Sequence, residues 1–283
     1  MKVRLFATEI YPLLKEIIQL LTTFSVDSPQ AEAEQIVSHF YNLNRTQIFQ
    51  NPDLHVTWKI RLMIEKMLRT RSNHCPLQYL LGQVEFYNSN IKVTQDVLIP
   101  RPETELLVDI ILQENKEKHL RVCDLGTGSG AIAIALKKAR PDWQVIATDI
   151  SAAALKIARE NALINDCLID FIQSDIFSDI KTKFDLIVSN PPYISKFDYD
   201  ILKPELFYEP LIALTAPEDG LYFYKKIINS ASKYLSLPAT LYLEIGAEQS
   251  SKISKLADQA KAQKIIIKKD YNNFDRFMII YFA

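Results

Sequence analysis

The chain has 283 residues, of which 48% are hydrophobic and 24% charged, and 33 basic residues nearly balance 34 acidic ones. This composition excludes a disordered, collagen-like or coiled-coil chain, and the length predicts one large or two modest domains. No segment reaches the roughly 18 uncharged apolar residues that a membrane span needs. We therefore expect a cytoplasmic protein without a membrane partner. Because the charge is balanced, we also expect no stable nucleic-acid partner.

The cysteines and histidines predict neither disulfides nor a metal site. The three cysteines are an odd and widely spaced set, which is typical of free thiols in a reducing compartment. The four histidines lack the spacing and the neighbouring cysteines that a tetrahedral metal site requires. We therefore expect no metal cofactor.

Residues 1–82 carry apolar side chains at helical spacing, which predicts a small helical domain. Within it, Ser28-Pro29 and Asn51-Pro52-Asp53 are typical of helix starts.

We predict that residues 83–105 form a linker between the two domains. Its segment 84–99 is rich in β-branched and aromatic residues, which favours a β-hairpin around a turn at Asn88-Ser89-Asn90.

Residues 106–283 alternate short apolar runs with helical stretches, which predicts an α/β domain with a mainly parallel sheet buried on both faces. The last two runs follow each other closely, so we expect them to form a hairpin at the edge of the sheet, with one strand antiparallel. The expected strands lie within the runs 120–126, 144–150, 169–175, 184–190, 240–246, 264–270 and 276–282.

The chain contains only 6 glycines, although proteins use about 7% glycine on average. Three of the six, Gly126, Gly128 and Gly130, lie within five residues between an expected strand and an expected helix. This concentration predicts a loop, completed by Thr127 and Ser129, in which the backbone turns sharply and approaches a nucleotide-like ligand. A glycine-rich turn without a ligand is the alternative interpretation.

Asp149 ends the next expected strand, where a carboxylate can accept hydrogen bonds from both hydroxyls of a ribose. NAD, FAD and S-adenosylmethionine all carry such a ribose. The glycines are spaced G-x-G-x-G rather than in the dinucleotide pattern G-x-G-x-x-G. In addition, the Asp124 carboxylate would repel a pyrophosphate but would suit the cationic amino group of a methionyl moiety. The sequence therefore favours S-adenosylmethionine.

Asn190, Pro191, Pro192 and Tyr193 follow the expected strand at 184–188, at the carboxyl edge of the sheet. The prolines fix φ and donate no N–H, so carbonyl groups of this loop can point outward. The side-chain oxygen of Asn190 and one such carbonyl can accept both hydrogens of a planar NH₂ group, while Tyr193 covers its flat face. Holding such a nitrogen in line with a methyl donor can supply most of the acceleration. The alternative is a rigid turn with an Asn cap.

On these motifs, the sequence resembles the HemK/PrmC family, the glutamine methyltransferases of peptide chain release factors, which are class-one S-adenosylmethionine-dependent methyltransferases. The more specific part of the resemblance is the segment Leu98-Ile99-Pro100-Arg101-Pro102-Glu103-Thr104-Glu105; Leu243-Glu244-Ile245-Gly246 and Asp275-Arg276 also match. The resemblance implies an N-terminal helical domain (1–82) that binds the release factor and a β-hairpin linker (83–105). It further implies a Rossmann-like methyltransferase domain (106–283) with a seven-stranded sheet.

The resemblance also implies a role for each site residue. The acceptor would be the side-chain amide nitrogen of the glutamine in the Gly-Gly-Gln motif of class-one release factors, held by Asn190, Pro191, Pro192 and Tyr193. The co-substrate would contact Asn190 as well. Its methionyl part would lie on Gly126, Thr127, Gly128, Ser129 and Gly130, its ribose on Asp149 and its adenine on Asp175-Ile176.

Three departures from the family pattern bear on these roles. Ile176 stands where a large aromatic residue is frequent, Ala216-Pro217-Glu218 replaces a usual Gly-Gly, and Asn273 replaces a glycine between the last two strands. Asn tolerates positive φ better than most residues. For Arg101, a contact at the wall of the active site and an ion pair with Glu103 or Glu105 are both open.

Two other functions are open from the residues alone. The same Asn-Pro-Pro-Tyr loop could hold the amino group of adenine or guanine in DNA or RNA. Such an enzyme should present a basic face, whereas residues 1–82 contain 9 basic and 7 acidic residues. The third possibility is a non-catalytic module that senses the methyl donor or a tRNA-like partner.

Overall fold

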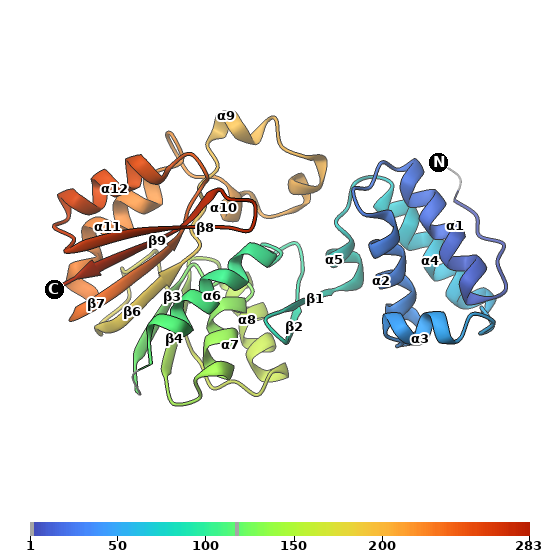
Figure 1. The fold of residues 1–283 in the computed structure, drawn as a ribbon, viewed down its shortest axis with the longest axis horizontal. Coiled ribbons are helices and arrows are strands. Elements are labelled where there is room, and N and C mark those ends of the chain that lie inside the picture. Colours follow the sequence, from blue (N-terminus) through green and yellow to red (C-terminus); the bar gives the residue numbers. More distant parts are fainter. Residues whose placement is uncertain (1–2, 117–118) are drawn as a thin grey trace. The chain divides into compact units, whose positions relative to one another are not determined.

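The computed structural model describes residues 3–116 and 119–283, and its chain divides into two compact units, Met1–Gly82 and Gln83–Ala283 (Figure 1). Each unit has a hydrophobic core of its own. Within the described ranges, none of the helices has the length and apolar character needed to cross a membrane.

The first unit is helical, as the apolar spacing predicts. Its apolar faces meet in a core that includes Leu13, Ile17, Ile36 and Leu68, all fully buried. An ion pair of 2.8 Å between Arg71 and Glu32 joins two of the helices, with the guanidinium almost fully buried. The helices are α1 (Ile10–Thr23), α2 (Pro29–Tyr41), α3 (Arg45–Gln50), α4 (Trp58–Arg71) and α5 (Leu77–Leu81).

One of the two predicted helix starts is confirmed and the other is wrong. Helix α2 begins at Pro29 with Ser28 at the N-cap. Asn51, however, ends α3, because its N–H bonds back to the carbonyl of Gln47. Helix α4 begins only at Trp58, where the hydroxyl of Thr57 accepts the N–H of Ile60 at 3.3 Å. Thr is a common N-cap residue, so the start of α4 is set by Thr57 and not by Pro52 upstream.

The predicted hairpin exists but is shorter than expected and turns one position earlier. Strands β1 (Gln83–Phe86) and β2 (Ser89–Lys92) pair antiparallel, with Phe86 opposite Ser89. The turn is therefore Tyr87-Asn88, and both residues have positive φ, 45° and 56°. The carboxylate of Glu105 accepts the N–H of Tyr87 at 2.9 Å, a contact that supports a conformation unfavourable for tyrosine.

The second unit contains a seven-stranded sheet in the order β5-β4-β3-β6-β7-β9-β8 (Figure 1). The five strands from β5 to β7 are parallel, and β9 runs antiparallel between β7 and β8. The α/β class, the seven-stranded Rossmann-like sheet and the edge hairpin are thus confirmed. The strands are β3 (Arg121–Leu125), β4 (Gln144–Asp149), β5 (Asp170–Gln173), β6 (Phe184–Ser189), β7 (Leu235–Glu244), β8 (Lys264–Lys269) and β9 (Asp275–Phe282).

Helices cover both faces of the sheet, which is why the inner strands β3, β4 and β6 are buried over most of their length. Helices α6 (Pro102–Glu114), α7 (Ala131–Ala139) and α8 (Ala152–Ile164) pack along one face. Helices α11 (Tyr222–Tyr234) and α12 (Ser250–Gln259) pack along the other. Between β6 and α11 the chain forms α9 (Lys196–Tyr199), a 3₁₀ turn (Pro204–Tyr208) and α10 (Leu211–Leu214).

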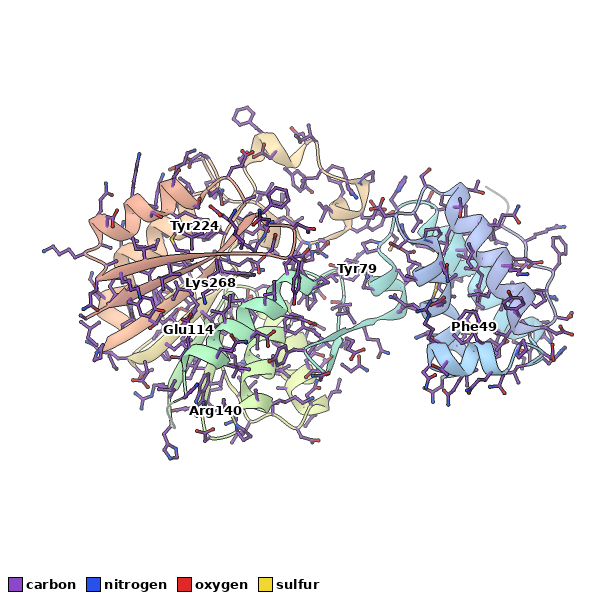
Figure 2. The ribbon with its side chains drawn as sticks, viewed as in Figure 1. Phe49, Tyr79, Glu114, Arg140, Tyr224 and Lys268 are labelled. Carbon is purple, nitrogen blue, oxygen red and sulfur yellow. The ribbon has the colours of Figure 1, made fainter. Side chains whose placement is uncertain are left out.

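Polar side chains tie the helices to the sheet at defined points (Figure 2). Glu114 at the end of α6 pairs with Lys268 of β8 at 3.0 Å. On the other face, the buried hydroxyl of Tyr224 in α11 donates to the carbonyl of Glu244 at 3.0 Å. The first contact joins α6 to the edge strand β8, and the second joins α11 to the end of β7.

Candidate active site

A cavity opens at the carboxyl ends of β3, β4 and β6, where parallel sheets of this kind bind ligands. The space between its lining residues is about 880 Å³, including the open solvent at its mouth. Gly126 and Gly128 line it from the loop after β3, Asp149 from the end of β4, and Asn190 from the end of β6. The structure therefore brings together the three motifs that the sequence places on separate loops.

The three loop glycines divide into two kinds. Gly126 and Gly128 line the cavity with φ of 69° and 55°, and a Cβ atom added at either would meet only open space. A Cβ atom on Gly130 would instead lie 3.2 Å from the Cβ of Ala158 in α8. Gly126 and Gly128 thus open the backbone toward a ligand, whereas Gly130 lets α7 pack closely on α8.

The side chains of Thr127 and Ser129 are buried and are not among the described residues that line the cavity. Thr127 donates its hydroxyl to the buried carboxylate of Asp124 at 2.6 Å, and that carboxylate also accepts the N–H of Ala133 at 3.2 Å. Asp124 itself is absent from the lining residues, so the prediction that it faces a cationic ligand group is not what the structure shows. Its burial raises its pKa to about 7. Asp124 therefore stabilises the glycine loop through its hydrogen bonds to Thr127 and Ala133.

Asp149 is held by two backbone N–H groups, one from the loop after β3 and one from the loop after β4. Its two carboxylate oxygens accept the N–H of Gly128 at 2.9 Å and that of Ser151 at 2.8 Å. Each carboxylate oxygen has two lone pairs, so acceptor capacity remains for a ligand. Burial raises the pKa of Asp149 above its usual value, and the backbone N–H bonds oppose that rise.

Asn190, Pro191 and Pro192 line the cavity as the sequence predicts. The loop is anchored at its start, where the hydroxyl of Ser189 donates to the carbonyl of Leu125 at 2.7 Å. This bond joins the ends of β6 and β3. The side-chain nitrogen of Asn190 lies 3.5 Å from the hydroxyl oxygen of Thr104 in α6.

Tyr193 differs from the expectation that its ring covers the flat face of a ligand. It is outside the described lining of the cavity, and it packs against the core beneath the sheet's carboxyl edge. Its carbonyl accepts the side-chain N–H of Gln249 at 3.0 Å, and only a glycine fits at Gly220, where an added Cβ would lie 2.4 Å from that carbonyl oxygen. Burial raises the pKa of the Tyr193 phenol to about 12.

Four more residues line the cavity, two that the sequence predicts and two that it does not. Asp175 and Ile176 line the cavity as predicted, Ile176 with a φ of 55°. Ile150, next to Asp149, and Phe223 of α11 also line it. Nothing in the local sequence marks Phe223, because it reaches the cavity from a helix about 50 residues downstream. The cavity thus has an aromatic ring although Ile176 supplies none.

Arg101 pairs with Glu209, not with Glu103 or Glu105. The buried carboxylate of Glu209 also accepts the backbone N–H of Ile99 at 3.0 Å. Val97, Leu98, Ile212 and Ala213 line the cavity, so this pairing joins two of the segments that line it. Arg101 therefore acts behind the wall and does not line the cavity in the described part of the chain.

The other two departures from the family pattern, besides Ile176, also include residues whose backbone has a positive φ. Asn273 has a φ of 65°, which Asn accommodates better than most residues. Glu218 has a φ of 59° beside Gly220, and its carboxylate pairs with Lys225 at 2.7 Å.

In residues 3–116 and 119–283, no group of three or more His, Cys, Asp or Glu side chains could hold a metal ion.

Comparison with known proteins defines the class and then the family. The family model "Methyltransferase small domain" matches residues 102–208, so the second unit is a methyltransferase domain. A methyltransferase from Pyrococcus furiosus shares the fold, with a TM-score of 0.53 and 18% identity over 76% of this chain and 97% of that one. The family model "PrmC N-terminal domain" matches residues 12–82.

Two bacterial relatives match 85% or more of this chain. The release factor glutamine methyltransferase of Streptococcus pneumoniae is 44% identical over 85% of this chain and 89% of its own length. That of Lactococcus lactis is 40% identical over 93% of this chain and 98% of its own. The chain belongs to the release factor glutamine methyltransferase family, as the sequence motifs predict.

Proposed function

We propose that this protein transfers a methyl group from S-adenosylmethionine to the side-chain amide nitrogen of the glutamine in the Gly-Gly-Gln motif of class-one release factors. The observation that carries the proposal is one cavity lined by Gly126 and Gly128, by Asp149, and by the Asn190-Pro191-Pro192 loop. The names of the curated relatives point to the same acceptor and do not favour a nucleic-acid base. The same proposal places the protein in the cytoplasm, where release factors act.

The residues present fit S-adenosylmethionine, which supplies a methyl group activated by a positively charged sulfur. The open backbone at Gly126 and Gly128 offers room for the methionyl part, and Asp149 retains acceptor capacity for ribose hydroxyls. Ile150, Ile176 and Phe223 offer apolar surface for a purine. In this proposal Thr127, Ser129 and Gly130 support the loop from behind.

The Asn190-Pro191-Pro192 loop fits a planar amide as the acceptor. The side-chain oxygen of Asn190 and a backbone carbonyl of the loop would accept the two N–H groups of the glutamine amide. These bonds draw electron density toward the amide nitrogen, and they strengthen as positive charge develops there. Tyr193 would act through its carbonyl bond to Gln249, which fixes the end of the loop.

The test is transfer of a labelled methyl group. Purified protein incubated with methyl-labelled S-adenosylmethionine and a bacterial class-one release factor should label the glutamine of its Gly-Gly-Gln motif, located by peptide mass spectrometry. A release factor with that glutamine changed to glutamate should remain unlabelled. Absence of label on both class-one factors, or label on RNA alone, would contradict the proposal.

We further propose that the helical unit, Met1–Gly82, contacts the release factor. It matches the family's N-terminal model and exposes large apolar side chains. Trp58 and Leu62, one helical turn apart on α4, are 64% and 53% exposed. Phe6 is 72% exposed. Its backbone carbonyl accepts a hydrogen bond from Arg61 of α4 at 3.3 Å, which places Phe6 next to this helix. Exposed apolar side chains gathered in this way are typical of protein interaction sites.

Replacing both Trp58 and Leu62 with alanine should raise KM for the release factor about thirtyfold, because each truncated interface anchor costs on the order of 1 kcal/mol and about 1.4 kcal/mol corresponds to a factor of ten. The value of kcat and the Kd for S-adenosylmethionine should change little, since neither residue is among the described residues that line the cavity. Leu168→Ala, an 85% exposed position in the second unit, is the matched control. An unchanged KM in the double variant would exclude this surface.

A further inference from the structure

A buried polar pair lies directly behind the Asn190 loop, outside the described lining of the cavity. Glu244 at the end of β7 is 2% exposed, and Thr104 in the first turn of α6 is 4% exposed. The hydroxyl of Thr104 donates to the Glu244 carboxylate at 2.7 Å. Burying a carboxylate is costly unless it is well paired, so a strong reason is needed for an acidic group at this position.

The direction of this bond determines which way Asn190 faces. A threonine hydroxyl has one hydrogen, and here that hydrogen is committed to the carboxylate. Toward Asn190 the oxygen of Thr104 can then only accept, and the atom of Asn190 that lies against it, at 3.5 Å, is the side-chain nitrogen. The side-chain oxygen of Asn190 is left for the cavity. An oxygen at this point is what an N–H of an acceptor amide requires.

We propose that Thr104 and Glu244 are positioning residues for methyl transfer, which hold the Asn190 amide with its oxygen toward the acceptor. This inference rests on the proposed function and names two residues that act through Asn190 without touching the acceptor. Without the carboxylate, the Thr104 hydroxyl is free to donate to Asn190, and the amide can turn to present its nitrogen instead.

The surroundings of Glu244 make its charge sensitive to pH near neutrality. Arg276 of β9 and Arg101 before α6 favour the ionised carboxylate, whereas Glu103 opposes it. Tyr193 of the loop and Tyr224 of α11 also face this group, the latter through its bond to the Glu244 carbonyl. Burial dominates these influences and raises the pKa of Glu244 to about 7. The protonated acid no longer demands the Thr104 hydrogen, so kcat should fall as the pH falls below about 7.

The test compares Thr104→Val, which removes the hydroxyl at constant shape, with Thr104→Ser, which keeps it. Methyl transfer to a release factor is measured together with the Kd for S-adenosylmethionine. Thr104→Val should lower kcat about tenfold, the effect of losing one orienting hydrogen bond, with an unchanged Kd. Thr104→Ser should restore kcat to within about threefold of the wild type. Thr148→Val is the matched control, because Thr148 is also buried but its hydroxyl has no partner in the described ranges.

A second variant, Glu244→Gln, should lose the decline of kcat below pH 7 that the wild type shows. A wild-type kcat in Thr104→Val, or an unchanged pH profile in Glu244→Gln, would overturn the inference while leaving the proposed function intact. If Thr104→Val fails to fold, as judged by its circular dichroism melt, the Glu244→Gln profile decides. A wild-type protein that labels neither release factor would refute the proposed function, and the inference with it.

Discussion

Replacing Asn190 with alanine should lower kcat for release-factor methylation by about two to three orders of magnitude, the loss seen when one preorganised hydrogen-bonding group is removed from an active site. The reason is that the bond from the Asn190 oxygen to the acceptor amide strengthens as charge develops on the nitrogen. The loop itself should survive, because Ser189 and the prolines anchor its backbone independently of the Asn190 side chain.

The measurement is single-turnover methyl transfer at saturating substrates, beside the Kd for S-adenosylmethionine from titration calorimetry. A large fall in rate with little change in Kd is expected, because the co-substrate is held mainly by the loops after β3 and β4 in this proposal. Asn272→Ala, in the exposed turn between β8 and β9, controls for a general effect of losing an asparagine. Full activity of Asn190→Ala would remove the proposed acceptor site.

The arrangement of the fold was predictable because it is encoded locally. Each strand of the seven-stranded sheet contains a short apolar run, and the glycine loop, Asp149 and the Asn190 loop each follow such a run directly or end it. In parallel sheets the carboxyl ends of neighbouring strands meet at one edge. Chain order and strand pattern were therefore sufficient to predict that these three motifs converge on one cavity.

The parts that were not predictable depend on partners distant in sequence. Arg101 finds Glu209 and not the nearer Glu103, because the chain after β6 folds back against the segment before α6. Tyr193 lies adjacent in sequence to Pro192, yet it is outside the described lining of the cavity, and its carbonyl accepts the side-chain N–H of Gln249. Spacing along a chain predicts which backbone segments meet, but the direction of a side chain depends on the competing partners.

The bond between Thr104 and Glu244 shows the same limit in a functional setting. Both residues lie in motifs that carry the family resemblance, but the motifs are about 140 residues apart, and neither contains a signal that pairs it with the other. Their pairing follows from the packing of α6 against the end of β7. The sequence could therefore predict the groups that contact substrates, whereas the residues that orient those groups became visible only in three dimensions.

Replacing Asp149 with alanine should weaken S-adenosylmethionine binding by about two orders of magnitude. A charged acceptor of hydroxyl hydrogens contributes roughly 1.5 to 3 kcal/mol per bond, and every 1.4 kcal/mol changes Kd about tenfold. The variant also leaves the N–H groups of Gly128 and Ser151 without their acceptor, which loosens the loop. Asp149→Asn keeps one acceptor oxygen and should lose less affinity.

Titration calorimetry as a function of pH separates the charge of Asp149 from its shape. Burial raises the pKa of this carboxylate, so wild-type affinity should begin to fall on acidification at a pH above the usual range of aspartate, as protonation removes the charged acceptor. The Asp149→Asn protein should lack that dependence, and Asp170→Ala, at the exposed start of β5, should behave as the wild type. At saturating S-adenosylmethionine, Asp149→Asn should recover most of its kcat, unlike Asn190→Ala. If Asp149→Ala kept its Kd and lost kcat instead, the carboxylate would act on the acceptor, and its assignment to the ribose would be wrong.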